Sequence, residues 1–366
     1  MSEVQDAMIV AGGAGTRLRP LTRTTPKPLL PFCGAPFLSG VIRRLADVGV
    51  RRVLLVVGAD PSPFELLRAD ARAVGVTLES VPEPEPLDTA GGVREAVERV
   101  DGTFLVLNGD ILTDVDVAEA IAAHRRSDAD ATLVLTRVED TSTFGVAVRD
   151  EGRIVDFVEK PAPGSLPGHD TVNAGTYVLE PDAITRFPRG RLSFEREVFP
   201  GLVEQGAHVE GWVGEGVWAD LGTPERFLAG HRRALDGELR WPSLAALPQP
   251  SSGCWQHERA EVASGATLIG PVLLGPDVRI EAGARVGPHV VLGAGTRVAA
   301  DAELRDSVLF DGVRVGRGVR AEGALVGHHA SLGPDVQVER EVIVGDGIAV
   351  DPGACLAAGT RYPDDG

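Results

Sequence analysis

Lysine is almost absent from this sequence. Lysine and arginine together number 36 among 366 residues, yet only Lys27 and Lys160 are lysines, and a proline follows each of them. An ammonium group is a compact charge that fits between phosphate oxygens, whereas a guanidinium is a flat fork that prefers a planar partner. Two retained lysines therefore indicate two places where a compact cation is needed. The alternative is that a general preference for arginine left two lysines by accident.

The region around Lys27 contains no acidic side chains. Residues 7–46 lack Asp and Glu altogether, although the whole chain has a net charge of -17. Such an acidic protein is expected to repel nucleic acid and anionic membranes. The cationic residues of this segment are Arg17, Arg19, Arg23, Lys27, Arg43 and Arg44. The segment therefore favours a small, highly charged anion as its ligand.

A glycine-rich turn lies within this basic segment. Gly12, Gly13 and Gly15 follow an apolar run, and Arg17 comes two residues later. Successive glycines let backbone amides approach a phosphate chain and form an anion-binding nest. Tight turns use the same residues, and the stretch is neither a Walker A loop nor a dinucleotide fingerprint. Phosphate binding is therefore predicted from the turn together with Arg17 and with Lys27, which two prolines hold rigidly.

Two aspartates are candidate ligands for Mg²⁺. Asp110 ends the apolar stretch FLVLNGD, and Asp220 lies between Trp218 and Leu221. Mg²⁺ takes few protein ligands and keeps several waters, so two carboxylates and the phosphates of a nucleotide form a plausible site. Taken alone, each aspartate is more often an ordinary turn or cap residue.

The second lysine lies near side chains that suit a sugar. Glu159 precedes Lys160 at the end of an alternating strand pattern, and the stretch NAGTYVL supplies the amide of Asn173 and a glycine that permits close approach. Carboxylate and amide groups bind sugar hydroxyls, and Lys160 would hold a phosphate on the same molecule. A salt-bridged strand end explains the same residues equally well.

The first part of the chain predicts a doubly wound α/β sheet. From Ala7 to about Leu235, short apolar runs alternate with helix-like stretches, which is typical of parallel strands joined by crossover helices. Ligands of such sheets bind at the carboxyl ends of the strands. A stretch rich in Pro and Ser follows. We therefore expect one domain at residues 1–237, a linker at 238–256 and a second domain at 257–366.

The second domain repeats every six residues. Aliphatic residues recur at this spacing with Gly, Pro and Asp between them, and two of the steps are five residues long. Such hexapeptide repeats predict a parallel β-helix, in which each inward side chain stacks on its equivalent in the next coil. The predicted inward positions are Val262, Leu268, Leu274, Ile280, Val286, Leu292, Val298, Leu304, Leu309, Val315, Ala321, Val326, Leu332, Val338, Val344, Val350 and Leu356.

Together these motifs resemble the sugar-1-phosphate nucleotidyltransferases, also called nucleotide-sugar pyrophosphorylases. The match runs in order through GGAGTRLRP, PKPLLP, EPLDTAGG, LNGD, FVEKP, NAGTY and WADLGTPERF, and it covers nearly the whole chain. The resemblance implies a Rossmann-like nucleotidyltransferase domain followed by a left-handed parallel β-helix. It also implies transfer of a nucleoside monophosphate from an NTP to a sugar 1-phosphate, with release of pyrophosphate.

The resemblance further implies roles for individual residues. Those residues are Gly12, Gly13, Gly15, Glu83, Glu85 and Gly91 for the nucleotide, Arg17 and Lys27 for the phosphates that become pyrophosphate, Asp110 and Asp220 for Mg²⁺, and Gly145, Glu159, Lys160, Val172 and Asn173 for the sugar phosphate. Arg17, Lys27 and Asp110 would form the catalytic group. No general base is required, because the attacking phosphate is already an anion. Catalysis would instead depend on alignment of the reactants and neutralisation of charge.

The nucleotide base is predicted from the acidic stretch PEPEP. Guanine offers two adjacent donors that a carboxylate of Glu83 or Glu85 can accept, whereas uracil and thymine offer one donor between acceptors. PKPLLP, EPLDTAGG and LNGD also resemble the mannose-1-phosphate guanylyltransferase branch. The sequence departs from that branch at Asp88, where glycine is usual, and so places an extra negative charge near the nucleotide. The alternative is a UTP- or dTTP-using glucose-1-phosphate enzyme, and heptose or cyclitol phosphates remain possible acceptors.

Two other classes of function compete with this hypothesis. The β-helix of some family members transfers acyl groups, and His289, His328 and His329 are the residues available as a base. The second competing class is a regulatory homologue that binds nucleotide sugars without turnover.

The acidic N-terminus and the lack of a long apolar run favour a cytoplasmic protein without membrane partners. The stacked coils favour a homo-oligomer, either a dimer or a tetramer.

Overall fold

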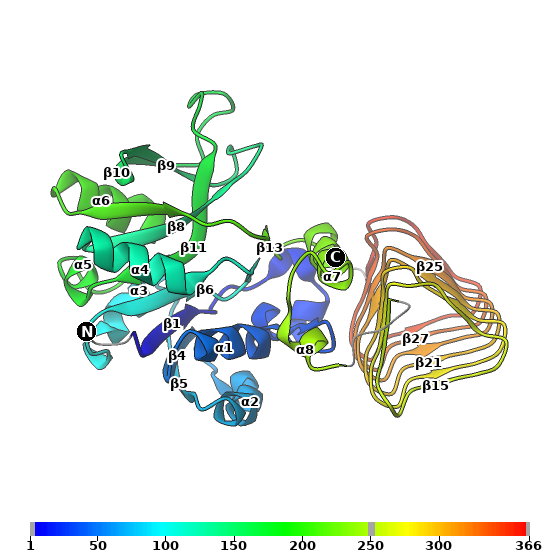
Figure 1. The fold of residues 1–366 in the computed structure, drawn as a ribbon. Coiled ribbons are helices and arrows are strands. Elements are labelled where there is room, and N and C mark those ends of the chain that lie inside the picture. The colour runs from blue at the N-terminus through cyan, green and yellow to red at the C-terminus, as the bar shows by residue number, and fades with distance from the viewer. Residues whose placement is uncertain (1–3, 248–252, 364–366) are drawn as a thin grey trace. The chain divides into compact units, whose positions relative to one another are not determined.

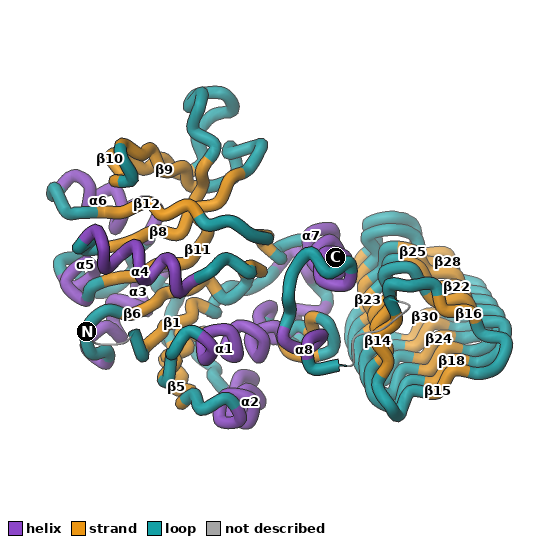
Figure 2. Tube along the Cα trace, viewed as in Figure 1, coloured by secondary structure: helices purple, strands orange, loops and turns teal. Residues whose placement is uncertain are grey.

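The computed structural model describes residues 4–247 and 253–363. The chain forms two compact units, one from Met1–Gly13 with Val41–Trp218 and the other from Ala14–Gly40 with Ala219–Gly366. Figures 1 and 2 show helices and longer strands in the first unit and stacked short strands in the second. No helix within the described ranges has the length and apolar character needed to cross a bilayer.

A nine-stranded sheet forms the centre of the first unit. Its strands are β1 (Asp6–Val10), β4 (Arg52–Val57), β5 (Thr77–Pro82), β6 (Phe104–Asn108), β8 (Ala131–Arg137), β9 (Gly145–Asp150), β10 (Arg153–Glu159), β11 (Thr171–Leu179) and β12 (Val209–Val213). Their order is β5-β4-β1-β6-β11-β8-β12-β10-β9. The first four are mutually parallel, as the alternating pattern predicts. The sheet as a whole is mixed, because β11 runs antiparallel to both β6 and β8.

The reversal of β11 carries its first residues past the end of β6. Thr176 pairs with Leu107, and a Cβ on Gly175 would lie 2.8 Å from the amide nitrogen of Asn108. Gly175 has a φ of +72°, so glycine suits both the backbone and the close approach. The chain reverses because strands β9 and β10, rather than a crossover helix, lie between β8 and β11. The amino-terminal half of β11 therefore lies at the edge where ligands are expected.

Helices pack on this sheet from several segments. They are α2 (Leu67–Ala73), α3 (Asp88–Ala96), α4 (Val117–Ser127), α5 (Pro181–Thr185) and α6 (Phe199–Glu204), while α1 (Phe37–Asp47) spans the boundary between the units. α3 contacts β1 and β4, and α4 contacts β8, β11 and β12. Met8, Leu54, Phe104, Tyr177 and Phe199 have no exposed surface in the core. Burial along almost their whole length explains why β1, β4 and β6 read as continuous apolar runs.

Three parallel sheets of very short strands form the β-helix, and their coils enclose a triangular outline (Figure 1). The first sheet contains β14 (Cys254–Gln256), β17 (Val272–Leu274), β20 (Val290–Leu292), β23 (Val308–Leu309), β26 (Leu325–Val326), β29 (Ile343–Val344) and β32 (Arg361–Tyr362). The second contains β15 (Glu261–Val262), β18 (Arg279–Ile280), β21 (Arg297–Val298), β24 (Arg314–Val315), β27 (Ser331–Leu332) and β30 (Ala349–Val350). The third contains β16 (Thr267–Leu268), β19 (Arg285–Val286), β22 (Glu303–Arg305), β25 (Arg320–Glu322), β28 (Gln337–Val338) and β31 (Cys355–Leu356).

The predicted hexapeptide repeat is confirmed. Ile280 pairs with Val298 one full coil later, and every predicted inward residue lies in the core of the β-helix or packs against it. Val262 and Leu268 are only partly buried, because they belong to the first coil and have a neighbouring coil on one side alone. The five-residue steps shorten two coils by one residue without breaking the stack.

The rest of the second unit is formed by residues 14–40, which are distant in sequence, and by the segment that precedes the β-helix. These contain the short helices η1 (Thr16–Leu18), η2 (Leu21–Arg23) and η3 (Lys27–Leu29), the strands β2 (Pro31–Phe32) and β3 (Ala35–Pro36), and the helices α7 (Pro224–Leu235) and α8 (Pro242–Ala245). Trp241 stacks on Phe37 with ring centroids 5.2 Å apart. A Cβ on Gly40 would lie 2.3 Å from the Trp241 ring, so glycine is required there.

Part of the predicted linker at 238–256 is packed. Leu239, Trp241 and Leu244 are buried, and β14 already belongs to the first β-helix sheet. Residues 248–252 lie outside the described residues. The domain boundaries at 237 and 256 stay predictions.

Candidate active site

Three predicted site residues lie after strands of the first unit that end at one edge of its sheet. Gly12 follows β1, Glu83 follows β5, and Asp110 follows β6. Because these strands are parallel, their carboxyl ends meet at the same edge. The N–H of Gly109 donates to the carbonyl of Val10 at 2.8 Å and ties the turn before Asp110 to the end of β1. The fold thus gathers a glycine-rich turn and two carboxylates at the edge where ligands bind in α/β sheets.

The carboxyl group of Glu83 lies between two glycines. A Cβ on Gly12 would be 3.1 Å from Oε2 of Glu83, and a Cβ on Gly92 would be 2.4 Å from Oε1. Glu83 is only 7% exposed, and this burial raises the pKa of its carboxyl group, with a smaller opposing effect from the N–H of Gly92. A pocket of about 520 Å³ lies beside it and is also lined by the exposed Glu85. Of the two predicted base-reading carboxylates, only Glu83 is held in a fixed position by packing.

Gly91 is placed by packing within the first unit. A Cβ at this position would lie 2.5 Å from the carbonyl oxygen of Gly190. Its N–H donates to the carbonyl of Leu192 at 3.1 Å. The N–H of Gly91 is thus already hydrogen-bonded within the first unit. Gly91 would therefore contribute to nucleotide binding by leaving room for the nucleotide and not by donating a hydrogen bond. Gly13, in contrast, is exposed and has no atom within 4 Å of a Cβ position.

Asp88 carries an extra charge that the structure pairs. Its φ is +67°, which explains why glycine suits this position. Oδ2 of Asp88 lies 2.6 Å from a guanidinium nitrogen of Arg196 and 3.5 Å from Nε of Arg191. The sequence indicated an extra negative charge near the nucleotide, and in the structure two arginines accompany this charge.

The predicted sugar-phosphate residues include one exposed lysine. The Lys160 side chain is 65% exposed, and its Nζ lies 3.5 Å from Oε1 of Glu159. The N–H of Lys160 donates to the carbonyl of Phe144 at 3.0 Å, next to Gly145. A Cβ on Gly145 would be 2.9 Å from Oε2 of Glu159 and 2.5 Å from the ring of Phe157. Gly145 therefore makes room for the Glu159 carboxylate.

Asn173 and Val172 lie on β11 close to this group. The Asn173 amide donates to the hydroxyl of Tyr177 at 2.8 Å, and its oxygen accepts the N–H of Gly175 at 2.9 Å. Val172 has no exposed surface and pairs with Val146 on β9. Val172 can therefore offer a sugar only its backbone, whereas Asn173 is half-buried and held in one orientation.

Glu195 is a candidate site residue that the sequence interpretation missed. Its carboxylate accepts hydrogen bonds from the hydroxyls of Thr89 at 2.7 Å and Ser193 at 3.0 Å. Burial raises the pKa of Glu159, and the negative charge of Glu195 raises it further. Glu195 thus binds the start of α3 and lies close enough to Glu159 for its charge to act there. Ser193 beside acidic residues indicated a helix start, but nothing in the sequence showed which way Glu195 points.

The second unit contains the remaining phosphate-binding candidates. Gly15 has a φ of +58°, and a Cβ there would lie 3.0 Å from both the Lys27 Cβ and the Thr22 methyl group. The hydroxyl of Thr22 donates to the carbonyl of Gly15 at 2.9 Å. Gly15, Thr22 and Lys27 therefore form one tightly packed turn. The Lys27 side chain is only 10% exposed.

Asp220 is surrounded by three cations of the second unit. Oδ1 lies 3.5 Å from Nζ of Lys27, while Oδ2 lies 2.9 Å from Arg226 and 4.0 Å from Arg17. Oδ1 is buried and accepts no hydrogen bond from the described residues. A carboxylate oxygen without a donor suits a metal ligand. A Cβ on Gly222 would be 2.5 Å from Arg17 and 2.7 Å from Oδ1, so glycine is needed beside this cluster.

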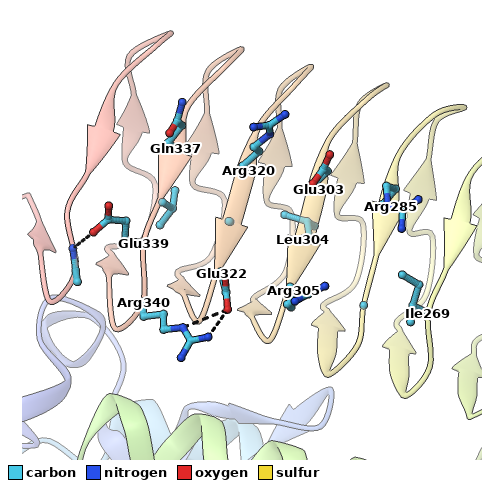
Figure 3. A pocket seen from close by; sticks show the side chains of 14 residues that line it. Ile269, Arg285, Glu303, Leu304, Arg305, Arg320, Glu322, Gln337, Glu339 and Arg340 are labelled. Atoms are coloured by element: carbon cyan, nitrogen blue, oxygen red, sulfur yellow. Dashed lines mark hydrogen bonds and ion pairs between the residues drawn. The ribbon is translucent and has the colours of Figure 1, made fainter.

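A hollow on the β-helix contains none of the predicted site residues. It measures about 640 Å³ and lies along the third sheet. Figure 3 shows Arg285, Glu303, Arg320 and Gln337 in a row across neighbouring coils, with Glu322 and Arg340 paired beside them. Opposite charges on neighbouring coils attract one another along a β-helix face.

The histidines proposed for acyl transfer have structural partners. His289 lies 2.8 Å from Oδ1 of Asp236, just after α7. His328 packs against Phe310, with ring centroids 5.0 Å apart. His329 is exposed and has a φ of +57°, which places it in a corner of the coil. None of these observations favours acyl transfer.

Comparison with known proteins identifies the family. Residues 6–237 match the family described as nucleotidyl transferase, and residues 268–364 match the GMPPB C-terminal domain. The chain is 40% identical over 317 residues to a mannose-1-phosphate guanylyltransferase of Mycobacterium tuberculosis, covering 86% of this chain and 82% of that one. It is 32% identical over 351 residues to the mannose-1-phosphate guanylyltransferase catalytic subunit beta of Danio rerio, covering 94% and 92% respectively.

A solved structure agrees with this result. HddC from Yersinia pseudotuberculosis complexed with GMP-PN has a TM-score of 0.53 and is 28% identical, covering 62% of this chain and 98% of that one. The family match extends over more than half of the chain, and the relatives extend over nearly all of it. The chain therefore belongs to the nucleotidyl transferase family and is a nucleotidyltransferase enzyme.

Proposed function

We propose that this enzyme transfers GMP from GTP to a sugar 1-phosphate, with mannose 1-phosphate as the preferred acceptor. A phosphate oxygen of the sugar forms a bond to the α-phosphorus, and the bond from that phosphorus to the bridging oxygen breaks, which releases pyrophosphate. The observation that carries the proposal is Glu83, whose buried carboxyl group lies against Gly12 of the phosphate-binding turn. Two adjacent donors of guanine match such a carboxylate. The names of the relatives support mannose 1-phosphate.

The reaction requires no base from the protein, because the sugar phosphate is already an anion. In this proposal Lys27 and Arg17 neutralise the phosphates that leave as pyrophosphate, while Lys160 binds the phosphate of the sugar. The carboxylate of Glu159 accepts hydrogen bonds from the sugar hydroxyls, and the side-chain amide of Asn173 exchanges hydrogen bonds with them. The rate then comes from holding the two phosphates in line and from stabilising charge on the α-phosphate.

Asp110 and Asp220 are the residues that would hold Mg²⁺. The buried Oδ1 of Asp220, which lacks a hydrogen-bond donor, fits a metal ligand. No group of three or more metal-ligating side chains occurs in the described part of the chain, and Mg²⁺ bound mainly by phosphates and water does not need one. When bound, Mg²⁺ would supply positive charge to the nucleotide phosphates. The oligomeric state stays a prediction.

The test is a pyrophosphate-release assay that crosses four NTPs with a panel of sugar 1-phosphates in the presence of Mg²⁺. We expect the largest kcat/KM for GTP with mannose 1-phosphate and loss of activity after metal chelation. A larger kcat/KM for dTTP or UTP with glucose 1-phosphate would overturn the base and sugar assignment. Acetyl transfer from acetyl-CoA to a hexosamine phosphate would instead revive the acyltransferase hypothesis.

A further inference from the structure

One face of the β-helix is apolar and covered. The outward residues of the five strands between β14 and β32 in its first sheet are no more than 3% exposed, and they are Leu273, Val291, Val308, Leu325 and Ile343. Most outward residues of the other two sheets are charged or polar and exposed, and Figure 3 shows the row from Arg285 to Arg320. Apolar surface of this extent is stable only when other chain segments remove it from water.

The segments that cover this face include the one that carries Arg17 and Lys27. A Cβ on Gly34 would lie 3.6 Å from the Leu273 side chain. Helix α7 adds two ion pairs to the coils: Arg232 with Asp306, and Asp236 with His289. This packing explains why residues 14–40 form a unit with the β-helix.

One corner of the β-helix contacts the phosphate-binding segment directly. A Cβ on Gly345 would lie 3.1 Å from the ring of Pro20, which is buried. The hydroxyl of Thr24 donates to Oδ2 of Asp346 at 2.5 Å. The other oxygen of Asp346 accepts the N–H of His328 at 2.7 Å and so belongs to the hydrogen bonding of the coil. Asp346 therefore connects a β-helix corner with the segment.

The contact lies only a few residues from the groups assigned to the phosphates. Pro20 and Thr24 flank helix η2, which contains Thr22. Thr22 closes the turn at Gly15, whose Cβ position is filled by Thr22 and Lys27. A displacement of η2 would thus be transmitted to Lys27 through close-packed atoms.

We propose that the Gly345–Asp346 corner is a positioning element for the catalytic turn, so that the β-helix contributes to turnover as well as to assembly. This inference rests on the proposed function in one respect: it assumes that Arg17 and Lys27 bind the NTP phosphates. Asp346 and Thr24 are positioning residues, since neither is assigned a contact with substrate.

Two pairs of variants separate positioning from folding. Thr24→Val removes the hydroxyl at nearly constant volume, whereas Thr24→Ser keeps it. Asp346→Ala removes both hydrogen bonds of the corner, and Asp311→Ala is its matched control. Asp311 occupies the equivalent corner two coils earlier, where Oδ1 accepts the N–H of Ala294 at 2.8 Å. Only Asp346 also binds the phosphate-binding segment.

We expect kcat to fall about tenfold in Thr24→Val and Asp346→Ala, because a small misplacement of a catalytic group lowers the rate strongly. The KM for the sugar 1-phosphate should stay within about twofold of the wild-type value, since residues of the first unit are assigned to that substrate. Thr24→Ser and Asp311→Ala should keep kcat within about twofold of wild type. Equal kcat values in Thr24→Val and Thr24→Ser would overturn the proposal.

A second readout does not depend on activity. Hydrogen exchange of the backbone amides in residues 16–25 should become faster in Thr24→Val and Asp346→Ala but not in the two controls. Unchanged exchange in Thr24→Val would also overturn the proposal, and this result stays decisive if Asp346→Ala folds poorly. If wild-type enzyme transfers no nucleotide, the proposed function fails, while exchange still reports whether the corner holds the turn.

Discussion

The two lysines of this chain occupy contrasting environments. The Lys27 side chain is 10% exposed and that of Lys160 is 65% exposed, although each ammonium lies 3.5 Å from a carboxylate. Lys27 is packed beneath Gly15 in a short helix, whereas Lys160 has a φ of +49° and begins a loop. The contrast teaches that the same residue type before proline serves as a fixed charge in one unit and as an adaptable charge in the other. Fixed charges suit stabilisation of a transition state, and adaptable charges suit capture of a substrate.

The largest expected effect comes from Lys27→Arg. The larger guanidinium does not fit the packed position beneath Gly15, so the positive charge would move away from the phosphates. We expect kcat to fall about 10²–10³-fold, the range found when one donor to a developing negative charge is lost. Steady-state kinetics with both substrates varied would measure this change. A loss no larger than that in Lys160→Arg would remove the distinction between the two lysines.

The packing around the buried His231 in the second unit should make stability depend on pH. Burial lowers the pKa of His231 from 6.5 to about 4. Its Nδ1 lies 2.9 Å from the carbonyl of Phe227, and its Nε2 accepts the N–H of Cys33 at 3.2 Å, so the neutral ring is the form that fits. Above about pH 6.5 the ring is neutral in both the folded and the unfolded chain, and this contribution is fully present. As the pH falls from 6.5 to 4, only the unfolded chain binds the proton, so stability decreases by up to about 3 kcal/mol.

Urea unfolding of wild type and His231→Gln between pH 7.5 and pH 4.5 would measure the pH-dependent contribution of His231 to the free energy of unfolding. His231→Gln is expected to be less stable at pH 7.5 but to lose less stability on acidification. His124 acts in the same direction, because burial lowers its pKa too. It is present in both proteins, so the difference between them isolates His231. Parallel pH profiles would show that His231 contributes nothing.

A smaller effect is expected from changes at the predicted base-reading carboxylates. Glu83 is buried and Glu85 is exposed, so they differ in the same way as the two lysines. Glu83→Gln replaces an acceptor with an amide whose NH₂ faces the donors of guanine. We expect the preference for GTP over ATP in kcat/KM to fall about 10- to 100-fold, as for loss of a charged hydrogen bond. Glu85→Gln is the matched control, because Glu85 lines the same pocket but is exposed. Similar losses in both variants would argue against Glu83 as the base-reading residue.

The smallest effect is expected from Lys160→Arg. The exposed position has room for a guanidinium, which keeps the charge but binds phosphate with a different geometry. We expect the KM for the sugar 1-phosphate to rise about tenfold, with the KM for NTP and kcat within about threefold of wild type. A rise in the KM for NTP instead would indicate that Lys160 binds the NTP and not the sugar 1-phosphate.

Much of the fold is predictable because its signals are local. The inward residues of the β-helix recur every six residues, and each coil repeats the same turn, so the sequence pattern identified all of them. The reversal of β11 was missed because the direction of a strand depends on what precedes it. The hairpin of β9 and β10 replaced the crossover helix that the alternating pattern suggested.

The candidate site is predictable only in part, for a related reason. Motifs identify Gly15, Lys27 and Asp220 one at a time. The three cations around Asp220 are contributed by η1, η3 and α7, and α7 is far from the other two in the chain. Asp88 shows the same limit. Its positive φ accounts for the usual glycine, but its pairing with Arg196 joins residues more than a hundred positions apart.

Residue types and short-range spacing alone determined that this chain would have a strand-rich α/β region, a hexapeptide-repeat β-helix, and the motifs of nucleotidyl transfer. These properties depend on backbone preferences and periodicities that span only a few residues. Tertiary structure alone decided that Lys27 is buried and Lys160 exposed, that Glu83 is held in place and Glu85 is not, and that a β-helix corner binds the segment that carries Arg17 and Lys27. Burial and charge pairing depend on which distant segments come together, and no local pattern encodes that information.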